Sequence, residues 1–235
     1  SPAYIRAACE AAGATPVFLS AAQLVNKAFF NARNFPVAVQ AAAGESFIYR
    51  YRRNGDGEAA YKRYLAEGGT LIVCQAATPF YYELLWTGDG WKARPPQRFW
   101  SMAFDLGFET NYGFEKPDET MRLELTAEGR ELWPGLPQPL ALDYMTDPRW
   151  RWLVPYRTSA ARRFVALGYA TKPDGERYPG LAAARVDFLD SEYGGARLFY
   201  LWGGMVEGAA GEEMLAGCLR YNRAHPPSGR KRGGT

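Results

Sequence analysis

The stretch 68–82, Gly-Gly-Thr-Leu-Ile-Val-Cys-Gln-Ala-Ala-Thr-Pro-Phe-Tyr-Tyr, constrains the fold of this chain most strongly. Two glycines end a helix, the apolar run at residues 70–73 predicts a short buried strand, and the residues after it predict a sharp turn. Cys74 is therefore expected at the carboxyl end of a strand. In open α/β sheets ligands and nucleophiles lie there, because the turn exposes a side chain and directs backbone N–H groups at it.

The first part of the chain alternates between helical and strand patterns. Apolar residues at helical spacing predict helices over residues 2–12, 20–30, 56–67 and 79–86, the second of them capped by Ser20. Short apolar runs between them predict strands over residues 15–19, 35–41 and 70–73. Strands that alternate with helices of this length are typical of a parallel sheet with helices on both faces.

The second part of the chain predicts further strands and one long helix. The strand patterns cover residues 120–125, 164–170, 182–189 and 197–202, and turn sequences such as Lys172-Pro173-Asp174-Gly175 separate them. A helix is expected at 211–222. We expect the strands at 15–19, 35–41 and 70–73 to be parallel neighbours, with 197–202 in the same sheet.

Length and composition favour one large domain. A chain of 235 residues that is 47% hydrophobic can bury a substantial core. We expect an α/β domain over residues 1–224 and a disordered basic tail over residues 225–235. No aromatic or basic stripe accompanies that tail, so a nucleic-acid partner is not expected.

The sequence contains no apolar stretch long enough to span a membrane, and it contains no recognisable signal peptide. The chain starts abruptly at Ser1, directly before a predicted helix, as expected if an upstream strand or leader has been removed. The compartment is therefore left open, with a secreted or periplasmic location among the alternatives. Self-association into a homo-oligomer is also left open.

The three cysteines, Cys9, Cys74 and Cys218, are too few and too widely spaced for a disulfide framework or a zinc site. We expect neither a metal nor a cofactor. Cys9 and Cys218 fall on apolar faces of predicted helices and are expected to be buried. A thiol nucleophile normally needs a neighbouring base, and the single histidine, His225, lies in the predicted tail.

Several motifs in residues 35–86 resemble the class I glutamine amidotransferase-like domains. They are Gly44-Glu45-Ser46 after a strand, Asn54-Gly55-Asp56-Gly57 at a helix start, the run from Gly68 through Cys74-Gln75-Ala76, and the aromatic Phe80-Tyr81-Tyr82. The resemblance is closest to the amidotransferase-like N-terminal domain of some biotin–protein ligases and to related domains found beside bacterial glycoside hydrolases. It implies a flavodoxin-like fold with a mainly parallel sheet. Active members carry a cysteine at the strand-end elbow, with a histidine and a glutamate after a late strand.

The sequence departs from that family at the positions that matter for catalysis. Ile72 and Ala76 stand where the family has glycines, two residues on either side of the cysteine. Trp202-Gly203-Gly204 stands where a His-Pro-Glu type sequence would be needed. Without an imidazole, the elbow N–H groups can lower a thiol pKa, but they cannot protonate the ammonia leaving group. We therefore expect an incomplete glutaminase triad.

Two functions remain open from the sequence. The first is a non-catalytic binding or structural module for a small molecule, a carbohydrate or a protein partner. Its ligand-binding residues are expected to be Gly44, Glu45, Ser46, Gln75, Ala76, Tyr81 and Tyr82. The alternative is a thiol-dependent hydrolase or amidotransferase with Cys74 as the nucleophile and the N–H groups around Gln75 and Ala76 as the oxyanion hole. On an elbow, Cys74 should be partly accessible and should react with iodoacetamide faster than Cys9 and Cys218.

Overall fold

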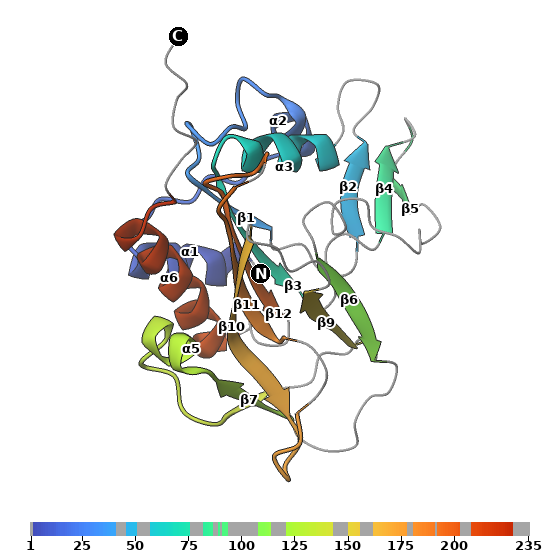
Figure 1. Ribbon diagram of the computed structural model, residues 1–235. Coiled ribbons are helices and arrows are strands. Elements are labelled where there is room, and N and C mark those ends of the chain that lie inside the picture. The colour runs from blue at the N-terminus through green and yellow to red at the C-terminus, as the bar shows by residue number, and fades with distance from the viewer. Residues whose placement is uncertain are drawn as a thin grey trace.

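The computed structural model is an α/β fold around a mixed seven-stranded sheet (Figure 1). It describes residues 2–40, 46–50, 57–75, 82–86, 89, 91–93, 108–113, 121–142, 150–155, 162–177, 181–190, 192–202 and 208–227. From one edge to the other, the strands are β1 (Val37–Gln40), β3 (Thr70–Gln75), β12 (Arg197–Trp202), β11 (Ala183–Phe188), β10 (Arg162–Thr171), β7 (Met121–Leu125) and β8 (Leu140–Leu142).

The three strands β1, β3 and β12 are parallel neighbours. Val37 and Arg197 both lie opposite Thr70, so the three strands run level with one another. The prediction that the strands at 35–41, 70–73 and 197–202 share one sheet in this way is confirmed. The predicted strand at 15–19 is wrong, since these residues form an irregular segment. Pro16 has no backbone N–H for a ladder, which disfavours a strand at this point.

The prediction of a mainly parallel, flavodoxin-like sheet is not confirmed. Four of the six strand pairings in the seven-stranded sheet are antiparallel: β12 with β11, β11 with β10, β10 with β7, and β7 with β8. The links between β10, β11 and β12 contain tight turns, in which Gly175 and Gly195 have φ values of 91° and 85°. Parallel strands need a long crossover connection, whereas turns of this kind return the chain in the opposite direction.

The helices of the described chain are α1 (Pro2–Ala11), α2 (Ala21–Val25), α3 (Gly57–Ala66), α5 (Ala127–Leu132) and α6 (Gly208–Ala224). The predictions of helices at 2–12, 56–67 and 211–222 are confirmed. Ser20 caps α2 and forms a capping box with Gln23, as expected from its position. Helix α2 ends earlier than predicted because asparagine side chains bond to the backbone after it and form turns instead: Asn26 accepts from the Ala28 N–H, and the Asn34 amide donates to the Phe29 carbonyl.

Helices cover both faces of the sheet near β1 and β3. The Thr70 hydroxyl donates to the side-chain oxygen of Asn222 on α6 (2.8 Å), while the Tyr61 hydroxyl on α3 donates to the Gln40 side chain. Gln40 lies level with Val73, three residues after Thr70, and side chains alternate along a strand. These two contacts are therefore on opposite faces. Helix α1 packs against α6, as Figure 1 shows.

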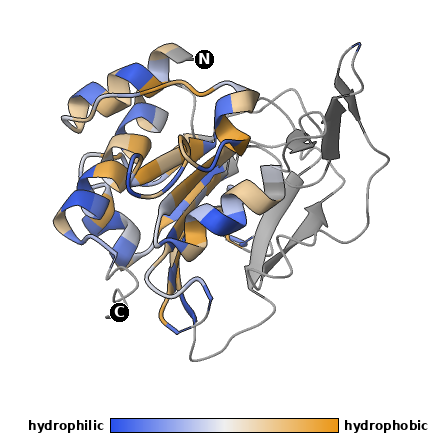
Figure 2. Ribbon diagram, turned by 90° about the horizontal axis from the view of Figure 1, so that it is seen from above, coloured by the Kyte–Doolittle hydropathy of each residue, from blue (hydrophilic) through white to orange (hydrophobic). Residues whose placement is uncertain are grey.

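The core lies between the sheet and these helices, and hydrophobic residues recur along the central strands (Figure 2). On the α6 side, Met214, Leu215 and Cys218 are fully buried. Trp133, which follows α5, packs against Gly217 of α6 and donates its indole N–H to the Met214 carbonyl (2.9 Å). The core thus joins α5, α6 and the sheet into one unit.

Two small sheets accompany the main one. The first consists of β2 (Ser46–Arg50), β4 (Tyr82–Trp86) and β5 (Trp91–Ala93), and the second of β6 (Phe108–Gly113) and β9 (Trp150–Pro155). The prediction of a helix at 79–86 is wrong over residues 82–86, which form β4. Strands β2 and β4 are parallel, and aromatic residues at both ends of β4 suit a strand better than a helix.

Candidate functional site

Cys74 lies inside a strand and not on the turn after it. Strand β3 continues to Gln75, two residues beyond the predicted strand end, and Cys74 is paired with Leu201 of β12. This pairing with β12 holds the Cys74 backbone within the sheet, one residue beyond the last pair between β3 and β1, Val73 with Gln40. The side chain is 5% exposed, so the expected partial accessibility of Cys74 is not found.

The surroundings of the Cys74 thiol keep it neutral. Burial raises the pKa of this thiol to about 12. Alternation along β3 places Cys74 on the same face as Thr70, which is the face that α6 covers. The buried Cys218 of α6 is close enough for Cys74 to help raise the pKa of the Cys218 thiol, after burial itself. Both cysteines are free, and no side chain in the described ranges hydrogen-bonds to Cys74.

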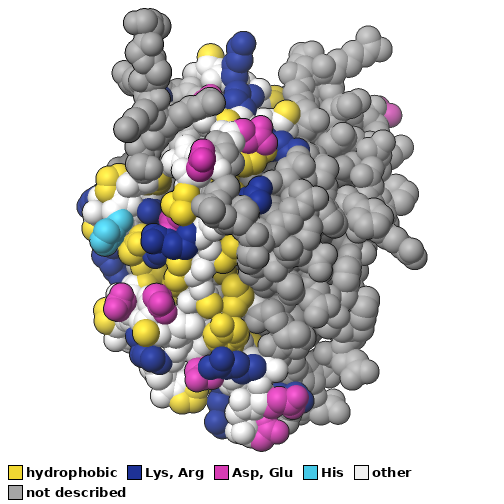
Figure 3. Space-filling model, viewed as in Figure 1, with side chains coloured by type: hydrophobic (Ala, Val, Ile, Leu, Met, Phe, Trp, Pro, Cys, Tyr) yellow, Lys and Arg dark blue, Asp and Glu magenta, His cyan; other side chains and the backbone are white. Residues whose placement is uncertain are grey.

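His225 lies just beyond the end of α6, where it contacts Tyr221 and Arg197. Its ring stacks on Tyr221, with 4.4 Å between centroids and 25° between planes. Its backbone carbonyl accepts a hydrogen bond of 2.6 Å from Arg197 Nη1. The ring is exposed, and the single histidine is visible on the surface in Figure 3. None of these contacts brings the imidazole to Cys74.

The end of α6 is also held by a buried ionic cluster around Asp187 of β11. Arg197 Nε and Arg185 Nε donate to its carboxylate over 2.7 Å and 3.0 Å. Burial alone would raise the pKa of Asp187, but the hydrogen bond from Arg197 and the charges of both arginines outweigh it and lower that pKa. Arg197 also donates to Asn222 (2.9 Å). We interpret the cluster as a structural anchor.

Three of the seven expected ligand-binding residues lie at the ends of described strands. Gly44, Glu45, Ala76 and Tyr81 lie outside the described residues. Ser46 begins β2, Tyr82 begins β4, and the two residues are direct partners in that parallel pair. Gln75 ends β3 beside Trp202, the last residue of β12. The structure therefore pairs Ser46 with Tyr82 in the small sheet, while Gln75 belongs to the seven-stranded sheet, and the shared ligand site stays a prediction.

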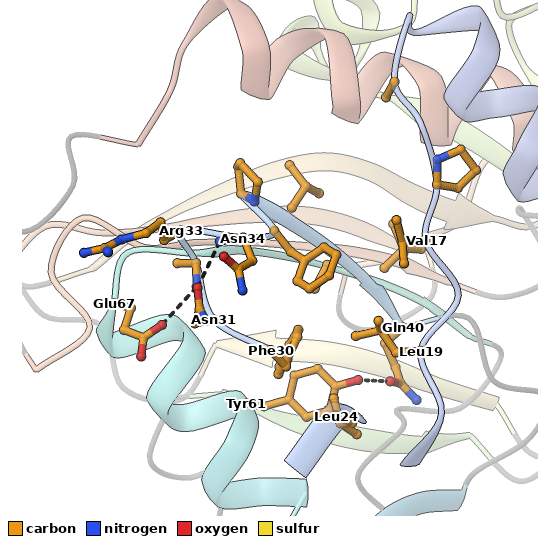
Figure 4. Close-up of a pocket in the computed structure, with 18 of the residues that line it drawn as sticks. Val17, Leu19, Leu24, Phe30, Asn31, Arg33, Asn34, Gln40, Tyr61 and Glu67 are labelled. Carbon is orange, nitrogen blue, oxygen red and sulfur yellow. Dashed lines mark hydrogen bonds between the residues drawn. The ribbon is translucent and has the colours of Figure 1, made fainter. Parts of the chain in front are cut away.

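A large open cleft follows the outer edge of β1, and the sequence motifs did not indicate it. Its volume is about 1970 Å³. One wall is formed by residues 14–21, the other by β1 and residues 27–36, and α1, α3 and α6 contribute to its ends. Figure 4 shows Val17 and Leu19 on the first wall, near Gln40. The one sequence signal for it was Pro16, which breaks the strand pattern of residues 15–19.

No protein-family model matches the chain. No curated protein matches it either. Among solved structures, Gan42B, a GH42 β-galactosidase, matches with a TM-score of 0.40 and 13% sequence identity over 72% of this chain. The match covers 19% of the β-galactosidase chain. These comparisons do not show a family, and the resemblance to amidotransferase-like domains stays a prediction.

Two further observations concern the described residues alone. They contain no group of three or more His, Cys, Asp or Glu side chains arranged to hold a metal ion. Within the same residues, none of the helices has the length and apolar character needed to cross a membrane.

Proposed function

We propose that this chain is a non-catalytic domain of the class I glutamine amidotransferase-like type that binds a small molecule, a carbohydrate or a protein partner. The amidotransferase-like domains of biotin–protein ligases and those beside glycoside hydrolases are its proposed relatives, on the sequence resemblance. The parallel strands β1, β3 and β12 would correspond to part of the flavodoxin-like sheet of that family. The observation that carries the proposal is the burial of Cys74 within a central strand.

Burial makes Cys74 a poor nucleophile for two reasons. The thiolate is the reactive form, and with a pKa of about 12 only about one thiol in 10⁵ is ionised at pH 7. In addition, the sulfur must contact a carbonyl carbon of the substrate, and a side chain that is 5% exposed leaves little room for this approach. Both effects favour a packing role for Cys74.

The described residues around Cys74 offer no general base or acid. The only imidazole in the chain, His225, is stacked on Tyr221 at the end of α6. General acid–base catalysis typically contributes about 10²–10⁴ to a rate. A glutaminase that lacked both this contribution and an ionised thiol would be far slower than a working enzyme.

The proposed ligand site lies where the parallel strands end. Strands β1, β3 and β12 point the same way, so their last residues, Gln40, Gln75 and Trp202, lie at the same end of the sheet. Ligands of open α/β sheets bind at such an end. Glu45 would suit a hydroxyl-rich or cationic ligand, and Tyr81 and Tyr82 would suit stacking against a sugar or a partner side chain.

The test is an assay of glutamine-dependent ammonia release with the whole chain. We expect the wild-type protein to release no more ammonia than the Cys74→Ala variant, because Cys74 is buried and un-ionised. The His225→Ala variant should behave identically. Ammonia release that is lost in Cys74→Ala and falls sharply in His225→Ala would overturn the proposal and make the chain a thiol enzyme with an unusual base.

A further inference from the structure

We propose that the outer edge of β1 is a second binding site, which takes an extended acidic peptide segment of a partner protein as an additional strand. The site is the cleft of about 1970 Å³ between β1 and residues 14–21. This site lies along the edge strand β1 and not at the carboxyl ends of the strands. The proposal is therefore independent of whether Cys74 is catalytic.

The backbone of β1 carries unpaired hydrogen-bonding groups on its outer side. The Thr70 N–H of β3 donates to the Pro36 carbonyl (3.1 Å). Alternate residues of a parallel strand face the same neighbour, so Pro36 and Ala38 face β3, whereas Val37 and Val39 face outward. In the part of the chain that the structure describes, the N–H and C=O groups of Val37 and Val39 have no partner. Such an edge is a template for one more strand.

The cleft has the shape that an added strand needs. Side chains of a strand alternate between the two faces of its sheet. On the α6 face the cleft is lined by the partly exposed Leu219, and on the α3 face by the partly exposed Phe35, whose ring packs against Phe30. A strand inserted beside β1 would therefore find apolar contacts for side chains on both of its faces.

Exposed apolar side chains line the opposite wall. Val17 and Phe18 are 56% and 45% exposed, which is unusual for large hydrophobic residues beside a cleft. Figure 4 shows Val17 and Leu19 on the extended segment that runs along this wall. Neighbouring exposed apolar residues of this kind mark interaction sites, because their burial by a partner is favourable.

The charges at the cleft favour an acidic partner. Its charged lining residues are Lys27, Arg33, Arg223 and the single carboxylate Glu67. Lys27 and Arg33 are exposed and form no ion pair with any described residue, and Arg223 donates to the Gly13 carbonyl. The Glu67 carboxylate accepts from the Ala32 N–H (2.9 Å) and lies 4.0 Å from Arg63. The free cations are complementary to carboxylates on a partner.

The test uses a fluorescein-labelled octapeptide of alternating glutamate and valine, titrated with the whole chain and followed by fluorescence anisotropy at low salt. Three controls are a lysine–valine octapeptide and two forms of the acidic peptide, in which one or the other set of alternate amides is N-methylated. We expect the acidic peptide to bind at least about tenfold more tightly than the lysine peptide. Each N-methylated form lacks the N–H donors along one edge of the peptide strand. At least one of the two forms should therefore bind more weakly than the unmodified acidic peptide, because it has lost the donors that pair with β1.

Matched variants locate the binding. Val39→Pro removes an outward N–H but none of the bonds to β3, and an edge strand tolerates proline at such a position. We expect it to weaken binding of the acidic peptide at least about tenfold, whereas Val39→Thr, which keeps the N–H, should not. Arg33→Glu should also weaken binding. The control is Arg122→Glu, which makes the same charge change at an exposed position of β7, near the edge of the sheet opposite β1. It should not change the affinity for the acidic peptide.

Three results would overturn the proposal. The first is no binding of the acidic peptide to the wild-type chain whose fold is verified by circular dichroism. The second is equal binding of the native and both N-methylated forms, with either set of alternate amides modified. The third is a dimer, seen in sedimentation equilibrium, that does not bind the peptide and that dissociates in the Val39→Pro variant. In that case a second copy of the chain would occupy the edge of β1. The peptide controls use the unaltered protein, so they remain decisive if Val39→Pro fails to fold.

Discussion

The buried carboxylate of Asp187 tests how much an ionic cluster contributes to the stability of the fold. Its carboxylate is bonded to two buried arginines, Arg197 and Arg185. Removing one member of a buried ionic cluster leaves the others uncompensated, which typically costs about 3–5 kcal/mol. We expect Asp187→Asn to lower the free energy of unfolding by about 3 kcal/mol in urea titrations at pH 7. Asp190→Asn, a nearby exposed position, is the matched control.

The same carboxylate predicts a pH dependence. The pKa of Asp187 is lower in the folded chain than its ordinary value of about 3.9, mainly because Arg197 and Arg185 overcome the effect of burial. Its contribution to stability is therefore complete above about pH 4 and is lost as the pH falls through the folded pKa. The gap in stability between the wild type and Asp187→Asn should narrow at about pH 3. A gap that is absent at pH 7, or unchanged at low pH, would show that the cluster does not anchor the fold.

At the scale of elements, the contact between α5 and α6 depends on a glycine. A Cβ at Gly217 would lie 2.5 Å from Trp133 Cδ1 and 2.8 Å from the Leu132 carbonyl oxygen. Helix propensity alone would make Gly217→Ala stabilising by about 1 kcal/mol. We expect the clash to dominate and to destabilise the protein by about 1–3 kcal/mol in thermal or urea unfolding. Gly135→Ala, where a Cβ meets nothing within 4 Å, should change stability little. A Gly217→Ala protein as stable as the wild type would mean that Trp133 is not tightly packed.

Helices, buried strands and the parallel grouping of β1, β3 and β12 could be predicted from local patterns, whereas the antiparallel pairings of the sheet could not. The apolar run of β3 and the capping residue Ser20 carry their own signals, and both elements begin where expected. Strand β10 pairs with β7, which ends more than thirty residues earlier in the chain, and no local pattern encodes that pairing. Residues 15–19 resemble a strand, but Pro16 and the absence of pairing with β1 leave them as the wall of the cleft.

At the scale of the whole molecule, a parallel half and an antiparallel half share one sheet. The parallel half follows the alternation of strands and helices in the first part of the chain, and the antiparallel half follows the turns at Gly175 and Gly195. The position of Cys74 near a strand end could be predicted, but its burial could not. That burial depends on β12 and α6, which come more than a hundred residues later in the chain.

The central claim is that the fold buries Cys74 and removes its reactivity, and iodoacetamide labelling followed by mass spectrometry tests it most directly. At about pH 8, we expect Cys74 in the folded protein to be labelled at least about 100-fold more slowly than in urea, because its pKa is about 12 and its sulfur is covered. It should also show no advantage over Cys9 and Cys218, which are buried too. Labelling of Cys74 in the folded protein at the unfolded rate, and ahead of Cys9 and Cys218, would contradict the account.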